Sequence, residues 1–151
     1  MVITKLLGIK YPVFQGGMAQ IARHELASAV SNAGGLGIIA SGGMSIEQIR
    51  EEIVNCKKHT DKPFAVNLML MMHNIDEIID VVIEEGVGIV TTGAGTPRKY
   101  MPKLKEAGIK ADIIREEPFV EAKDSVQYKI YIMKWKTQHG NYHTKIEEIT
   151  I

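Results

Sequence analysis

The sequence predicts an α/β protein with a parallel sheet, and a (β/α)8 TIM barrel is one architecture that explains the pattern. Short apolar segments alternate with amphipathic segments along residues 11–110, at intervals of roughly 25 to 30 residues, which is the spacing of parallel strands joined by right-handed helical crossovers. Glycine-rich turns follow three of the apolar segments, and in a barrel all three would lie at the carboxyl edge of the sheet. A doubly wound sheet explains the same order of elements.

The first strand is predicted at residues 11–15, where an apolar run stops at Gly16 and Gly17. Two glycines allow the main chain to turn with positive φ and to approach a ligand closely, although a simple strand-to-helix turn uses glycine as well. Helical spacing follows from Ile21 to Val30, and glycines at 34 and 35 end that helix. Residues 36–40 are apolar throughout, as expected of a strand buried on both faces.

The alternation continues with a helix and a third strand. Ser45, with Gln48 three residues later, resembles a capping box and predicts a helix start. Residues 61–63, Asp-Lys-Pro, break this helix. Residues 64–70 then predict the third strand, in which Asn67 is a polar residue that needs either a ligand or a main-chain partner.

A second helix start is predicted at Asn74, with Glu77 three residues later, and glycine at position 86 ends that helix. Residues 88–92 predict the fourth strand, and a short helix follows over residues 97–107. The turn Gly93-Ala94-Gly95 is not a dinucleotide fingerprint, because Arg98 stands where the third glycine would be required.

The pattern changes after residue 110. Residues 111–114 predict a weak fifth strand, and charge and proline over 115–118 end it. Residues 126–135 alternate with period two, and a second strand is predicted around residues 146–151, so the tail predicts a β-hairpin. We therefore divide the chain into a partial barrel domain, residues 1–110, and a divergent tail, residues 111–151.

Composition excludes several classes of function. The sequence holds 18 Lys and Arg against 18 Asp and Glu, so the net charge of zero favours neither nucleic acid nor an anionic membrane. Cys56 is the one cysteine, which excludes an internal disulfide and a multi-cysteine zinc site, and we expect it to pack on a helix. His139 and His143 are predicted to be solvated, and no metal is expected. The absence of a signal-peptide pattern and of a run of ~20 apolar residues predicts a cytoplasmic protein.

Four motifs, in order, resemble the superfamily of flavin-dependent enoyl-acyl-carrier-protein reductase II and nitronate monooxygenase (2-nitropropane dioxygenase-like) enzymes. They are Phe-Gln-Gly-Gly-Met-Ala at 14–19, Ala-Val-Ser-Asn-Ala-Gly-Gly-Leu-Gly at 29–37, Pro-Phe-Ala-Val-Asn-Leu-Met at 63–69 and Val-Thr-Thr-Gly-Ala-Gly at 90–95. The double glycine before Met18 is closer to the enoyl reductase branch, since nitronate monooxygenases more often carry Gly-Pro-Met there. The resemblance covers residues 1–110.

The resemblance implies a (β/α)8 barrel that binds FMN at its carboxyl rim. A flat ring requires close main-chain approach and a few polar groups in an apolar wall. Transferred by position, one turn would lie against the isoalloxazine ring, Asn67 would hydrogen-bond the flavin, and the turn after the fourth strand would line the pocket. The cofactor-binding residues implied in this way are Gly16, Gly17, Met18, Ala19, Asn67, Thr92, Gly93 and Gly95, and no catalytic residue is assigned.

The sequence also departs from the family. Complete members have a second half that supplies glycine-rich phosphate loops and a histidine in an Ala-Gly-Gly-His-type segment, and His139-Gly140 does not match that segment. The expectation is therefore a first half-barrel joined to an unrelated end, as a truncated gene would give, with weakened FMN retention and impaired activity.

Three functions follow from the resemblance. In the first, NAD(P)H reduces FMN and hydride passes to an enoyl thioester on acyl carrier protein, as in fatty acid biosynthesis. In the second, the enzyme oxidises an alkyl nitronate. In the third, a non-catalytic half-barrel self-associates through its open sheet edges. The sequence of this half separates the first two poorly.

Overall fold

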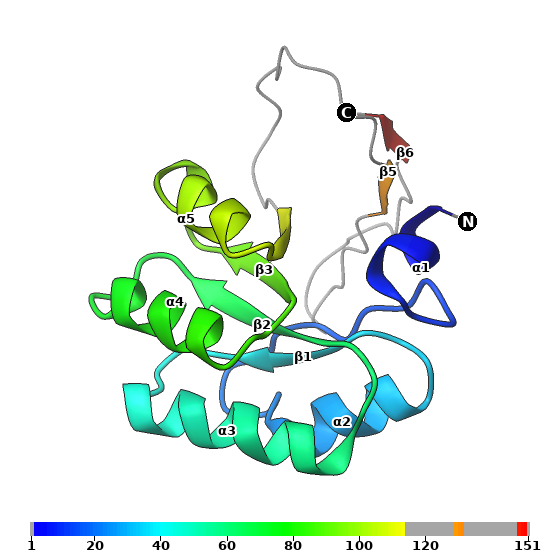
Figure 1. Ribbon diagram of the computed structural model, residues 1–151, viewed down its shortest axis with the longest axis horizontal. Helices are drawn as coiled ribbons and strands as arrows, with labels where there is room; N and C mark the ends of the chain where they lie inside the picture. The colour runs from blue at the N-terminus through cyan, green and yellow to red at the C-terminus, as the bar shows by residue number, and fades with distance from the viewer. Residues whose placement is uncertain (1, 114–128, 132–147, 151) are drawn as a thin grey trace, which may run out of the picture. The chain divides into compact units, whose positions relative to one another are not determined.

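The computed structural model describes residues 2–113, 129–131 and 148–150 (Figure 1). The chain divides into two compact units, Met1–Glu116 and Glu117–Ile151. In the second unit, β5 (Lys129–Tyr131) pairs antiparallel with β6 (Glu148–Thr150), and Ile130 lies opposite Ile149. The pairing is antiparallel, as the alternation predicted. The rest of the predicted hairpin, together with His139 and His143, lies outside the described residues.

The first unit contains a four-stranded parallel sheet in the order β1-β2-β3-β4. Its strands are β1 (Gly37–Ala40), β2 (Phe64–Met69), β3 (Ile89–Gly93) and β4 (Lys110–Ile113). Each strand pairs in parallel with the next strand along the chain. The predicted fold class, a partial barrel of parallel βα units, is therefore confirmed, and the weak fifth strand of the sequence is β4.

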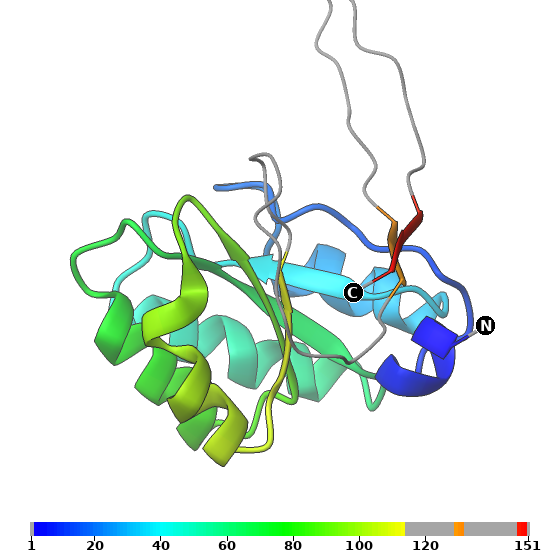
Figure 2. The same ribbon diagram turned by 90° about the horizontal axis from the view of Figure 1, so that it is seen from above.

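Helices precede the first of these strands and connect the others. They are α1 (Val2–Leu7), α2 (His24–Asn32), α3 (Ile46–His59), α4 (Ile75–Glu84), the 3-10 helix η1 (Pro97–Lys99) and α5 (Met101–Glu106). Figure 2 shows α3, α4 and α5 along one side of the sheet and α1 away from them. The described helices include none with the length and apolar character needed to cross a membrane.

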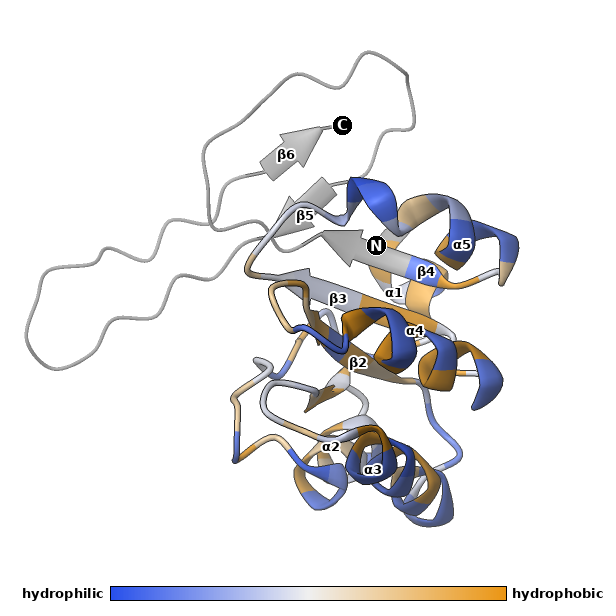
Figure 3. Cartoon of the chain, turned by 90° about the vertical axis from the view of Figure 1, so that its left-hand side faces the viewer, coloured by the Kyte–Doolittle hydropathy of each residue, from blue (hydrophilic) through white to orange (hydrophobic). Residues whose placement is uncertain are grey.

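Two apolar clusters lie on opposite faces of the sheet because side chains alternate along each strand. The larger cluster places Ile39, Val66, Leu68 and Val90 against α3, α4 and α5. The smaller one joins α1 to the other face, and it contains Ile38, Ala65 and Ile89 of the strands together with Leu36, which directly precedes β1. Figure 3 shows the matching pattern on α3 and α4, whose hydrophobic sides face the sheet and whose hydrophilic sides face away. We call the face that carries α1 the inner face.

The prediction of a full strand at residues 11–15 is wrong. The structure has one isolated parallel bridge there, between Phe14 and Leu36. Pro12 has no N–H to donate, and the N–H of Val13 donates instead to the carbonyl of Tyr11 at 2.8 Å, which bends the chain. The sequence also gave no sign of α1, because six residues are too few to show a helical period.

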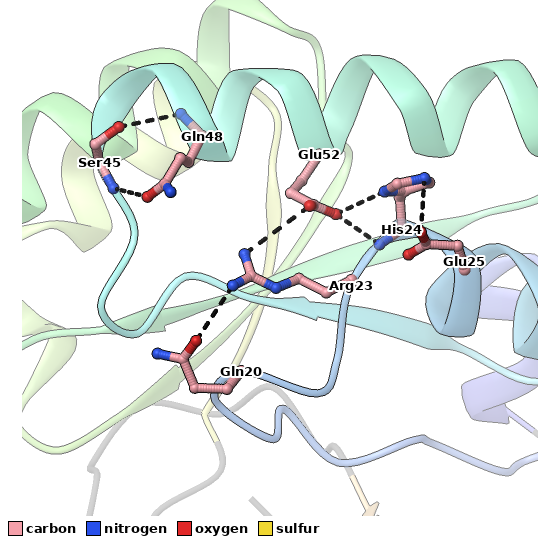
Figure 4. A network of polar contacts seen from close by, with 7 residues as sticks. All are labelled: Gln20, Arg23, His24, Glu25, Ser45, Gln48 and Glu52. Carbon is pink, nitrogen blue, oxygen red and sulfur yellow. Dashed lines mark hydrogen bonds and ion pairs between the residues drawn. The ribbon is translucent and has the colours of Figure 1, made fainter.

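The two predicted helix starts differ in outcome. At Ser45 the capping box forms: the N–H of Gln48 donates to Ser45 Oγ at 3.2 Å, and Gln48 Oε1 accepts from the N–H of Ser45 at 2.9 Å (Figure 4). At Asn74 the helix does begin, but the side chain makes no cap. Its Nδ2 donates to the carbonyl of Met44 at 3.3 Å, because the turn before α3 packs beside it.

Gly37 lets α2 pack directly on β1. A Cβ at this position would lie 1.8 Å from the main-chain oxygen of Ala27, a distance that no side chain can occupy. The helix thus lies closer to the sheet than any larger residue would permit.

Candidate functional site

The predicted site residues gather at the carboxyl edge of the sheet. The strand register sets Ala40 beside Asn67, and Asn67 beside Thr91, so these three residues lie at one level. Asn67 and Thr91 share the alternation of Ala65 and Ile89, which places their side chains on the inner face. The loops after β1, β2 and β3 begin just beyond this level.

Asn67 lies at the centre of the site, where residues from several segments approach its side chain. Its Nδ2 donates a hydrogen bond of 3.0 Å to Thr91 Oγ1, and Thr91 is 2% exposed. A Cβ on Gly17 would lie 2.8 Å from Asn67 Cβ and 2.9 Å from Asn67 Cγ, so no side chain fits between the 16–19 turn and this amide. A Cβ on Gly93 would lie 3.9 Å from Asn67 Nδ2. Main chain from two turns therefore approaches one inward amide.

Ser41 fixes the main chain of Asn67. The N–H of Ser41, which is fully buried, donates to the carbonyl of Asn67 at 3.2 Å. Ser41 Oγ accepts from the N–H of Met69 at 3.4 Å. Ser41 thus links the loop after β1 to β2 at the peptide groups on both sides of Leu68. Sequence reasoning missed this residue, although a serine that closes a fully apolar strand is a usable signal.

The structure brings some of the predicted residues together and separates others. Gly17, Asn67 and Gly93 form the group described above. Ala19 lies beside Gly42, where a Cβ would be 3.6 Å from Ala19 Cβ. Gly95 adopts φ of 148° and packs near Leu70, which explains the need for glycine there.

The remaining three predicted residues differ from this group in exposure or in orientation. Gly16 is exposed, and a Cβ there would meet nothing within 4 Å. Met18 is 43% exposed. Thr92 follows Thr91 in β3, so its side chain points to the opposite face from Asn67. Thr91, which the sequence analysis did not select, is the threonine that contacts Asn67.

A second polar network joins α2 to α3 (Figure 4). Arg23, the N-cap residue of α2, makes no side-chain cap. Glu52 on α3 takes its place: its Oε2 accepts from the N–H of His24 at 2.7 Å and lies 2.8 Å from the Nδ1 of the same residue. Its other oxygen lies 3.9 Å from Arg23 Nη1.

Three residues of this network, His24, Glu25 and Glu52, bring potential metal-ligating atoms within 4.8 Å of one another. Glu52 is already engaged by a main-chain N–H, an imidazole and a guanidinium, and the charge of Arg23 opposes a cation at this place. We therefore assign the network to helix capping and to the packing of α2 on α3.

The fold and the site define a class of protein, the (β/α)-barrel proteins whose binding residues lie at the carboxyl rim of the strands. Within this class, the chain belongs to the nitronate monooxygenase family, whose model matches residues 1–81. This is an oxidoreductase family with flavin-dependent members. The family resemblance seen in the sequence motifs is therefore confirmed.

Individual relatives agree with this assignment. The chain is 39% identical over 106 residues to a Mycobacterium tuberculosis protein named (3aS,4S,5R,7aS)-5-hydroxy-7a-methyl-1-oxo-octahydro-1H-indene-4-carboxyl-CoA dehydrogenase, over 70% of this chain and 30% of the relative. It is 51% identical over 65 residues to a nitronate monooxygenase of Pseudomonas aeruginosa, over 43% of this chain and 18% of the relative. The chain thus spans less than a third of the length of either protein.

Solved structures show the same fold. FabK from Thermotoga maritima superposes with a TM-score of 0.73 at 47% identity, over 74% of this chain and 36% of that protein. A nitroalkane oxidase from Streptomyces ansochromogenes superposes with a TM-score of 0.67 over 75% of this chain and 42% of that protein; at 24% identity it shows the fold alone.

Proposed function

We propose that the carboxyl-edge site is one wall of an FMN site, in an oxidoreductase that passes hydride from NAD(P)H through FMN to an enoyl thioester. The observation that carries this proposal is the contact between Gly17 and Asn67. It leaves bare main chain in front of an inward-facing amide, and a flat aromatic ring fits such a surface better than a branched ligand does.

Different residues of the chain would make different contacts with the flavin and the substrate. The main chain of residues 16–19 would lie against the ring, Asn67 would offer it a hydrogen bond, and Gly93 and Gly95 would line the pocket. Met18 and Met71, which are 43% and 73% exposed, are apolar side chains that would suit the acyl part of a thioester. When bound, the flavin supplies reversible hydride transfer, and the protein supplies orientation and exclusion of water.

Two observations support the thioester over the nitronate. The double glycine at 16 and 17 is the enoyl reductase form of the motif. The Mycobacterium tuberculosis relative is named for a carboxyl-CoA, which is itself a thioester. Two other observations support the alternative, oxidation of alkyl nitronates. They are the match to the nitronate monooxygenase family model and the identity of 51% to the Pseudomonas aeruginosa nitronate monooxygenase.

We also propose that this chain by itself retains FMN weakly. The residues assigned to the site are glycines, small or apolar side chains and two uncharged polar side chains, so none of them offers a positive charge to the phosphate. Ring contacts alone must then offset the entropy of binding. In the third reading the half-barrel is non-catalytic and self-associates. Its basis is that, among the described strands, β4 pairs on one side only.

Purification of the chain with and without added FMN tests these proposals. The enzyme proposal expects a flavin absorbance band after FMN addition, and turnover of NADH or NADPH with an enoyl thioester that exceeds turnover of an alkyl nitronate. Greater turnover of the nitronate would contradict enoyl reduction and favour nitronate oxidation as the activity. If the protein is colourless, stays inactive in excess FMN and sediments as a dimer or larger species, the enzyme proposal fails and the non-catalytic half-barrel is supported.

A further inference from the structure

The two ends of the Asn67 side-chain amide face different neighbours. Nδ2 donates to Thr91 Oγ1 at 3.0 Å and lies on the side of Gly93. Oδ1 lies on the side of the 16–19 turn, 3.3 Å from where a Cβ on Gly17 would stand. The amide is therefore oriented, with its donor end toward β3 and its acceptor end toward the turn that borders the site.

Oδ1 has no hydrogen-bond donor among the described residues, whereas Nδ2 is paired. Amide oxygen is an acceptor that can take two hydrogen bonds, and a half-buried acceptor without a partner favours a ligand that donates one. This acceptor borders Gly17, which carries no side chain that could donate to it.

Thr91 is the residue that sets this orientation. Its side chain is nearly fully buried, so its hydroxyl cannot exchange Asn67 for bulk water. Ser41 holds the main chain of Asn67 at the same time, and Gly17 packs against the Cβ and Cγ atoms of the side chain. Rotation of the amide would turn Nδ2 away from Thr91 Oγ1, and the hydroxyl would then have to donate to Oδ1 instead of accepting from Nδ2.

We propose that Thr91 is a positioning residue of the site: it holds the Asn67 amide so that Oδ1 is presented as the acceptor for a ring N–H of the bound ligand. The inference rests on the proposed flavin site. The oxidised isoalloxazine ring carries a single N–H, at the imide position N3, so that group is the donor which the arrangement selects.

Titration of FMN and of N3-methyl-FMN by fluorescence tests the inference in four proteins: the native chain, Thr91→Val, Thr91→Ser and Asn67→Ala. The native chain is expected to bind FMN about tenfold more tightly than N3-methyl-FMN, the loss typical of one unmade hydrogen bond. Thr91→Val keeps the shape of the side chain but removes the hydroxyl. It should bind FMN about tenfold more weakly and lose the preference for FMN, as Asn67→Ala should. Thr91→Ser should restore both properties.

The outcomes separate the inference from the function. If the native chain binds FMN but does not prefer it over N3-methyl-FMN, or if Thr91→Val keeps the preference, the inference is overturned while the flavin site stands. If the native chain binds neither ligand, the proposed function fails.

The positioning role has a readout without flavin as well. In 15N NMR spectra, the side-chain NH2 signals of Asn67, assigned with Asn67→Asp, should show one protected proton in the native chain and in Thr91→Ser, and none in Thr91→Val. An unprotected pair in the native chain would overturn the positioning role by itself. A lower unfolding midpoint for Thr91→Val with unchanged signals and unchanged preference would identify a merely structural residue.

Discussion

The side-chain amide of Gln15 replaces a peptide group beside Ile38. Gln15 Oε1 accepts from the N–H of Ile38 at 3.1 Å, and Gln15 Nε2 donates to the carbonyl of Ile38 at 3.0 Å. The main chain at residues 13–15 reaches Leu36 through two hydrogen bonds, of 2.8 and 3.0 Å, and the ladder then continues through this side chain. One glutamine thus closes the edge of β1 where a full strand does not form.

Gln15→Leu should lower the free energy of unfolding by about 1–3 kcal/mol. Ile38 is 1% exposed, so its freed N–H and carbonyl would be left without water or other partners. Urea unfolding at pH 7 measures the change. Gln15→Glu is the matched control, because its carboxylate can accept from the N–H of Ile38 but cannot donate to the carbonyl. The stability of this variant should therefore lie between those of the native protein and Gln15→Leu. Equal stability of all three proteins would show that the pairing contributes nothing.

Gly17→Ala should weaken FMN binding at least about tenfold, while Gly16→Ala should change it little. A Cβ at position 17 would have to displace Asn67, whose Cβ and Cγ lie within 2.9 Å of that point, whereas a Cβ at position 16 meets nothing within 4 Å. Fluorescence titration with FMN gives both affinities, and Gly17→Val should block binding more completely than Gly17→Ala. Equal affinities of the two alanine variants would show that the flavin site is wrongly placed.

Glu52→Ala should destabilise the protein by about 0.5–2 kcal/mol, the usual cost of a lost helix N-cap. It removes the acceptor for the N–H and the ring of His24, and thereby the link from α3 to the start of α2. Glu51→Ala is the control, because Glu51 is the preceding residue on the same helix and is exposed. Thermal unfolding compares the two variants; the same loss in both would argue against the capping role.

Cys56 should be unreactive in the folded protein. It is fully buried in the core, and burial, with a smaller contribution from the charge of Glu52, raises the pKa of its thiol to about 12. A thiol reagent at about pH 8 should label it only after denaturation, because the thiolate is the reactive form. Fast labelling of native protein would contradict this.

The same shift predicts a dependence of stability on pH. In the unfolded chain the thiol loses its proton near the ordinary pKa of 9, whereas the folded protein retains it up to about 12. The stabilisation is therefore complete below pH 9 and declines from pH 9 to 12, by at most about 1.4 kcal/mol per pH unit. Urea unfolding of native protein and of Cys56→Ala measures it: the difference in stability between the two should shrink as the pH rises. A constant difference would contradict the shift.

Most of the fold could be predicted because its helices and strands follow from patterns among residues that are close together in the sequence. The change from short apolar runs to helical spacing marks β2, α4 and β3 within a residue or two, and the capping box involves residues close together in the chain, Ser45 and Gln48. The errors fall where local patterns compete with more distant contacts. Asn74 carries the residues of a cap but donates to Met44, a contact that depends on how two loops pack.

The sequence by itself determined the order of parallel βα units and the two motifs that carry Gly17 and Asn67, because periodicity and glycine placement are properties of neighbouring residues. Only the tertiary structure decided that Thr91, and not Thr92, contacts Asn67. The face of a strand residue depends on its register with the next strand, and a shift of one residue exchanges the faces. Likewise, only the folded chain placed the side chain of Gln15 on Ile38, 23 residues away, since no local pattern encodes a hydrogen bond across that separation.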